Sequence, residues 1–170
     1  MPSNEKSEAH KHVEWCLKKA EKELKEGKDH KGLLKVDSDM KLAKDHITKA
    51  EHNLKALLHN QNSFSDWSIN MGFYAMYHCC LALLAKFGYA SKNQQCTLSA
   101  IEMLIEEKKI DASFKEYIEK MQGSNAKEER ILPMREDTQY TPVLSVEAKK
   151  VKELLALCQD MIDETKGIIG

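Results

Sequence analysis

The sequence predicts an all-α fold, an up-and-down antiparallel helical bundle of four main helices plus one or two short ones. Three observations predict it. Apolar residues recur at steps of three and four in several segments, no segment alternates with the period of a β-strand for long enough to build a sheet, and the central segments have short connections. At 170 residues the chain suits one compact domain.

The first two predicted helices are amphipathic. Residues 7–26 carry one apolar stripe and end at Gly27, which suits a helix C-cap. After a connector, residues 39–59 carry a second apolar stripe, with Asp37 or Ser38 as the candidate N-cap. The outer face of this second helix is rich in lysine and histidine. Its histidines, His46, His52 and His59, lack the i, i+4 spacing typical of helical metal ligands, so we expect a solvated face and no metal site.

The third predicted helix, FSDWSINMGFYAMYHCCLALLAKFG at residues 64–88, is the most apolar. Ser63 or Ser65 can cap its start, and Gly88 can end it. Two of its faces are apolar, so protein must cover it on both sides. We therefore expect one face inside the fold and the other in a subunit interface. His78 lies in the middle of this helix, where any chemistry would be found.

The rest of the chain predicts two more helices, a long loop and a last helix. A helix is expected from about Asn93 to Glu107, and a shorter one, capped by Asp111, runs through Met121. Residues 123–142, GSNAKEERILPMREDTQYTP, contain two prolines, one glycine and many charges, which predicts a long loop. Ser145 is the candidate cap of the last helix.

Composition excludes several classes. The net charge is −1, and only two of the 26 basic residues are arginine, which argues against sequence-specific binding of duplex DNA. The five cysteines are odd in number and without C-x-x-C spacing, so we expect buried free thiols in a reducing compartment. Neither a signal peptide nor a membrane span is indicated, and a cytoplasmic location is expected.

The segment NMGFYAMYHCCLALLAKFGY, residues 70–89, resembles the third helix of the HEPN domain (higher eukaryotes and prokaryotes nucleotide-binding), particularly its small prokaryotic members. That helix typically reads R-x-Y-Y-A-x-x-H-x-x-x-A-L-L before a glycine turn. The matching residues here are Phe73, Tyr74, Ala75, His78, Ala82, Leu83, Leu84 and Gly88. Residues 135–164 also resemble the family's tyrosine-containing loop and last helix. The resemblance divides the chain into an N-terminal helical extension with its connector, 1–36, and a HEPN-like bundle, 37–170.

In that family an R-x(4-6)-H motif cleaves RNA without metal, the histidine moving protons and the arginine stabilising phosphoryl charge. Here Met71 stands where the arginine is expected, and Cys80 stands where some relatives carry a tyrosine that a partner enzyme modifies. The resemblance thus implies a nucleotide- or RNA-binding or partner-binding module, leaning away from enzymatic activity and needing no cofactor. It also implies a homodimer through the second and third helices. A natural partner would be a minimal nucleotidyltransferase, as in prokaryotic toxin–antitoxin pairs.

A rival hypothesis keeps catalysis. In it His78 is the catalytic residue of a metal-independent ribonuclease, and Arg130 or Arg135 from the predicted loop supplies the missing cation. A purely structural protein is a third possibility, in which His78 bonds only backbone or a neighbouring polar side chain. The candidate nucleotide- or substrate-binding residues are Asn70, Tyr74, Arg130, Arg135 and Tyr140.

Overall fold

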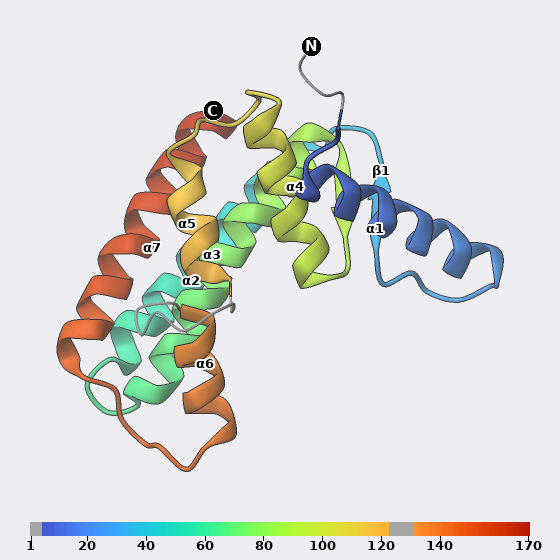
Figure 1. Cartoon of the computed structure of the whole chain (residues 1–170). Helices are drawn as coiled ribbons and strands as arrows, with labels where there is room; N and C mark the ends of the chain where they lie inside the picture. Colours follow the sequence, from blue (N-terminus) through green and yellow to red (C-terminus); the bar gives the residue numbers. More distant parts are fainter. Residues whose placement is uncertain (1–4, 123–130) are drawn as a thin grey trace.

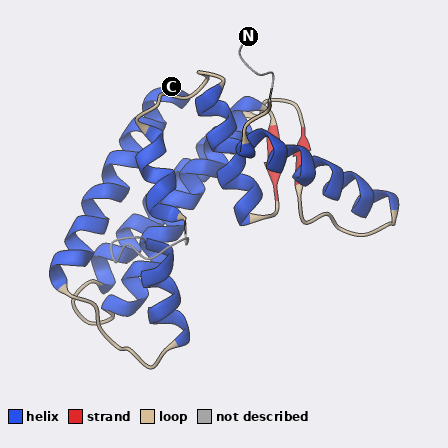
Figure 2. Cartoon of the chain, viewed as in Figure 1, coloured by secondary structure: helices blue, strands red, loops and turns tan. Residues whose placement is uncertain are grey.

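The computed structural model describes residues 5–122 and 131–170 and confirms the all-α prediction (Figures 1 and 2). The helices in this part of the chain are α1 (Glu8–Lys25), α2 (Met40–Asn60), α3 (Ser65–Phe87), α4 (Gln94–Glu106), α5 (Phe114–Met121), α6 (Ile131–Tyr140) and α7 (Ala148–Ile169). Two short strands, β1 (Leu33–Lys35) and β2 (Tyr89–Ser91), form an antiparallel pair.

Helix α3 is the centre of the fold, with α2 antiparallel to it as the short connection predicts (Figure 1). The Ser68 hydroxyl donates to the Leu57 carbonyl near the connection, and His46 meets His78 toward the other end. By length and composition α3 would qualify as a membrane span, yet 72% of its most apolar window is buried inside the fold. A core helix of a bundle has these properties, so the burial explains the hydropathy.

Helix α7 packs along α3 on another side and runs parallel to it, because α4, α5 and α6 intervene in the chain. At one end the Ser65 hydroxyl accepts from the Val146 N–H (2.9 Å), and at the other the Lys86 ammonium donates to the Ile168 carbonyl. Between them α7 crosses Gly72 so closely that an added Cβ would lie 2.6 Å from a Leu154 methyl carbon. An added Cβ would therefore force the Leu154 and Leu57 side chains to shift.

Gly88 ends α3 as predicted, in the left-handed conformation with φ of 83°. The structure adds a cap that the sequence analysis did not name, because the Asn93 side chain accepts from the Cys96 N–H (3.0 Å) at the start of α4. The cap of α2 was wrong by one or two residues, because Asp39 accepts from the Leu42 N–H (2.9 Å) in place of Asp37 or Ser38. The cap of α5 was also wrong, because Ser113, not Asp111, is its N-cap residue.

Two other predicted caps are also wrong. Phe64 precedes α3 without a side-chain cap, because the Ser65 hydroxyl is inside the helix and bonds the segment before α7. Glu147, not Ser145, is the N-cap residue of α7, and no side chain caps it. Both helices depend on packing at these ends instead of on a capping hydroxyl.

The predicted loop at 123–142 is wrong for residues 131–140, which form α6. Residues 123–130 lie outside the described residues. Pro133 is compatible with α6 because it is in the first turn, where its missing N–H has no intrahelical partner to lose. Ile131 is buried, and α6 packs on α3, so tertiary contacts offset the weak amphipathic pattern.

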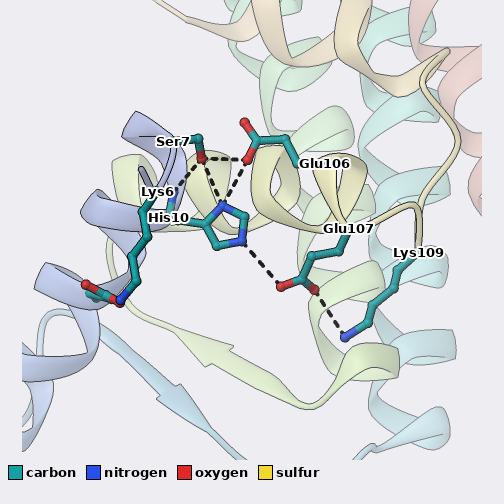
Figure 3. Close-up of polar contacts among 7 residues, drawn as sticks. Lys6, Ser7, His10, Glu106, Glu107 and Lys109 are labelled. Carbon is teal, nitrogen blue, oxygen red and sulfur yellow. Dashed lines mark hydrogen bonds and ion pairs between the residues drawn. The ribbon is translucent and has the colours of Figure 1, made fainter. Parts of the chain in front are cut away.

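The connector after α1 is more ordered than the sequence predicted. Leu33 pairs with Ser91 and Lys35 with Tyr89, so β1 joins the N-terminal segment to the residues after α3. The start of α1 is bound to the end of α4 (Figure 3), where His10 Nδ1 lies 2.9 Å from a Glu106 carboxylate oxygen. The extension is thus attached to the bundle at two points.

The prediction of free thiols is correct for three cysteines and wrong for two. Cys16 of α1 and Cys96 of α4 form a disulfide, a pairing that depends on α1 packing against α4. Cys79, Cys80 and Cys158 are free and buried. Burial raises the pKa of the Cys79 thiol to about 12, so these thiols stay protonated and unreactive.

Candidate functional site

One stripe of α3 faces outward at the seam with α2 and carries the residues predicted to matter. Successive turns of this stripe bear Trp67, Met71, Tyr74 and His78. Trp67 is 57% exposed and Tyr74 is 43% exposed, although they lie on the central helix of the fold. This outer stripe of α3, Trp67 to His78, is the candidate site.

His78 is paired with a second histidine from α2. The Nδ1 atoms of His46 and His78 lie 3.0 Å apart, and the two rings are tilted with centroids 5.2 Å apart. One Nδ1 must donate its hydrogen and the other must accept, so the two neutral rings hold opposite tautomers. Each imidazole thereby fixes the orientation of the other.

Both rings of this pair are neutral at pH 7. Burial, the neighbouring His46 and the Lys49 ammonium together lower the pKa of His78 to about 4. Burial also lowers the pKa of His46, although Asp45 opposes this. A histidine with so low a pKa holds no proton to donate near neutrality, which makes it a poor general acid.

Arg135 reaches the same stripe from α6. Its Nη1 donates to the Tyr74 hydroxyl (2.9 Å), and the guanidinium lies over the Phe73 ring at 4.5 Å and the Tyr74 ring at 5.4 Å. Its Nε is buried without a hydrogen-bond partner among the described residues. The guanidinium therefore stacks on two aromatic rings, one helical turn before His78.

The position of the expected arginine is apolar. Met71 is partly buried and packs against the core, with its sulfur 3.5 Å from the Asn60 side-chain nitrogen. A thioether carries no charge, so position 71 offers nothing to stabilise a phosphoryl anion.

Comparison with known protein families supports the resemblance seen in the sequence, because the HEPN domain family matches residues 43–168. The chain belongs to the HEPN family. The match spans α2 to α7 and leaves α1 and β1 before it. Membership makes the chain a nucleotide- or RNA-related module at the level of the family, and HEPN domains commonly form dimers. No curated protein matches the chain.

Of the six candidate residues, the structure brings Arg135 into contact with Tyr74, and His78 lies one turn further along the same stripe of α3. Asn70 is 8% exposed, on a neighbouring face of α3, with its amide 3.5 Å from the Asp66 carbonyl of its own helix. Tyr140 is 73% exposed at the end of α6, and Arg130 lies outside the described residues.

Sequence reasoning missed the partner of His78. His46 was grouped with His52 and His59 as a solvated face, but the structure turns it toward α3 instead. A signal for this pairing was present, because His46 and His78 are equally far from Asn62, which lies in the connection between two antiparallel helices.

Proposed function

We propose that this protein is a HEPN-type module that forms a homodimer through α2 and α3 and binds nucleotide or RNA there without cleaving it. The observation that carries the proposal is the pairing of His78 with a neutral His46, together with an uncharged Met71 about two turns earlier on the same stripe. A binding surface remains where a cleavage site would need both a proton donor and a fixed cation.

The chemistry of RNA cleavage supports this proposal. Attack of a 2′-hydroxyl on phosphate requires a base, an acid for the leaving oxygen and a positive charge near the phosphoryl oxygens. His78 is neutral near pH 7, and Met71 carries no charge. Loss of one preorganised charge alone costs about 100- to 1000-fold in rate.

A cleavage assay tests this part directly. We expect a labelled RNA to stay intact during long incubation with concentrated protein in EDTA, for the wild type and for His78→Ala alike. Cleavage that His78→Ala abolishes would contradict the proposal.

One observation favours the rival hypothesis, a ribonuclease with a relocated cation. The guanidinium of Arg135 reaches Tyr74 on the same stripe of α3 as His78. The rival predicts metal-independent cleavage that is lost in Arg135→Ala as well as in His78→Ala. The rival hypothesis can also use Arg130, which lies outside the described residues. The same cleavage assay with Arg130→Ala tests that alternative.

Exposed aromatic side chains support the dimer. Phe64 and Trp67 are each 57% exposed at the start of α3, and Leu58 of α2 is 43% exposed nearby in the chain. Large apolar side chains gathered at one end of a helical hairpin are typical of an interface. The prediction that α2 and α3 form the dimer contact rests on this face.

Sedimentation velocity at micromolar concentration tests the dimer. We expect a dimer for the wild type and a monomer for Trp67→Glu. Trp15→Glu is the matched control, because Trp15 is 54% exposed but lies on α1. A wild-type monomer, or a dimer that survives Trp67→Glu and not Trp15→Glu, would contradict the proposed interface.

Tyr74 and Arg135 are the residues that we propose for contact with RNA. Aromatic rings stack bases, and arginine pairs with phosphate. Base stacking on one aromatic ring contributes about 1–3 kcal/mol, so Tyr74→Ala should weaken binding of a fluorescent single-stranded RNA about 5- to 150-fold. Equal binding by a Tyr74→Ala variant that remains a dimer would rule out this contact.

The proposed partner is a minimal nucleotidyltransferase, in a toxin–antitoxin pair in the cytoplasm. Membership of the HEPN family supports it. The test is the neighbouring open reading frame and co-purification of its product with this chain. Absence of a nucleotidyltransferase gene beside this one would remove the basis for the pairing.

A further inference from the structure

Three side chains capable of binding a metal meet where α1 packs on α4, apart from the α3 stripe. His12 and Cys16 are four residues apart on one face of α1, and Cys96 lies in the first turn of α4. One ligand atom of each lies within 4.8 Å of the others. Both cysteines are fully buried, whereas His12 is partly exposed and forms the outer side of the group.

The histidine is already oriented as a ligand would be. Its Nδ1 is 2.6 Å from the Ser99 hydroxyl oxygen, and its Nε2 is 3.8 Å from the Cys16 sulfur. Trp15 stacks on the imidazole with ring centroids 5.5 Å apart. A hydrogen bond at one ring nitrogen, with the other nitrogen directed at the site, is the usual arrangement of a metal-bound histidine.

We propose that, once the Cys16–Cys96 disulfide is reduced, His12, Cys16 and Cys96 bind one soft divalent cation of the Zn²⁺ class. Cysteine sulfur and imidazole nitrogen are the ligands that such cations prefer. Three protein ligands leave a fourth position for water on the partly exposed side, beside His12. The proposal does not depend on the function of the α3 stripe.

The geometry fits such a cation after a small change. In a tetrahedral zinc site, bond lengths of about 2.3 Å to sulfur and 2.0–2.1 Å to nitrogen separate sulfur from nitrogen by about 3.6 Å. The observed separation of His12 Nε2 from Cys16 Sγ is 3.8 Å. The two sulfurs, now bonded, would move to about 3.8 Å apart. Side-chain rotation can achieve this because the two Cα atoms are 5.9 Å apart.

The redox chemistry balances with a reductant of the dithiol or phosphine class. The reductant supplies two electrons, the S–S bond breaks, and two protons convert the sulfurs to thiols. Binding of the cation then displaces both thiol protons to solvent. Disulfide and bound metal are thus mutually exclusive states of one pair of sulfurs.

Titration with Co²⁺, which substitutes for Zn²⁺ and gives thiolate-to-cobalt absorption, is the test. The full chain is reduced with a phosphine and freed of metal before titration. We expect saturation at about one Co²⁺ per chain with thiolate-to-cobalt absorption, displacement by Zn²⁺, and no such absorption for the oxidised protein. Cys96→Ser should abolish the absorption.

The histidine variants make the test independent of folding defects. His12 is only partly buried, so His12→Gln should keep the fold, as circular dichroism can verify, and weaken Co²⁺ binding at least tenfold. His52→Gln is the matched control because His52 is exposed on α2, and it should bind like the wild type. His46→Gln should likewise leave the absorption unchanged, which separates this site from the histidine pair. No absorption in the reduced wild type, or full binding by His12→Gln, would overturn the proposal.

Discussion

The histidine pair predicts that the protein loses stability as the pH falls from about 6.5 to about 4. In the unfolded chain His78 has its ordinary pKa of 6.5, whereas in the folded protein the pKa is about 4. Between pH 6.5 and about 4, His78 binds a proton in the unfolded state but not in the folded state. The free energy of unfolding therefore decreases as the pH falls through this window. The full difference corresponds to about 3 kcal/mol. Because His78 is only partly buried and water screens it, we expect about 1–2 kcal/mol.

Urea unfolding at several pH values between 7.5 and 4.5 measures this loss. Paired carboxylates also lose stabilising charge in acid, so the informative quantity is the difference between variants. His78→Gln should be less stable than the wild type at pH 7.5 and should lose less stability on acidification. His52→Gln, with an exposed histidine on the same helix as His46, should keep the wild-type pH dependence. An imidazole resonance of His78 that titrates near 6.5 would refute the reasoning.

Two further predictions concern packing and the disulfide. Gly72→Ala should lower the free energy of unfolding by about 1–2 kcal/mol, because overpacking against Leu154 exceeds the gain in helix propensity. Gly167→Ala, where an added Cβ meets nothing within 4 Å, should raise the free energy of unfolding by at most about 1 kcal/mol. Equal shifts of the melting temperature in the two variants would contradict this difference. Reduction of the Cys16–Cys96 disulfide in metal-free buffer should lower the free energy of unfolding by up to about 4 kcal/mol, because this bond joins residues that are 80 positions apart in the sequence. A Cys16→Ser/Cys96→Ser variant should melt equally with and without reductant.

Signals within a few residues predicted the helices well. The stripe over 7–26 corresponds to α1, and Gly88 ends α3 as the sequence indicated, while Asn93 caps α4 near the start that the sequence placed there. A glycine that needs positive φ and an asparagine that accepts a nearby N–H act locally, so the sequence contains all the information required. Asp39 shows the limit of this precision, because the two predicted candidates, Asp37 and Ser38, differ from it only in which side chain the backbone brings into reach.

Features that depend on distant partners escaped prediction. Helix α6 contains a proline and few apolar residues, and it exists because it packs on α3, which its own sequence does not reveal. The pairing of β1 with β2 and the Cys16–Cys96 disulfide both require the N-terminal segment to return to residues after α3. An odd cysteine count cannot indicate which two sulfurs meet.

The methionine at position 71 and the His46–His78 pair both act against catalysis. A cation at position 71 would add positive charge along the stripe that holds His78, and like charge nearby further lowers the pKa of an imidazole. Arginine there would therefore leave the His46–His78 pair neutral as well, so the two departures are separate: Met71 removes the fixed cation and the histidine pair removes the proton donor. Conversely, a histidine that must ionise is better served by a carboxylate neighbour than by a second imidazole. Loss of the arginine and gain of the histidine pair both favour an uncharged surface on α3, which suits association and stacking better than proton transfer.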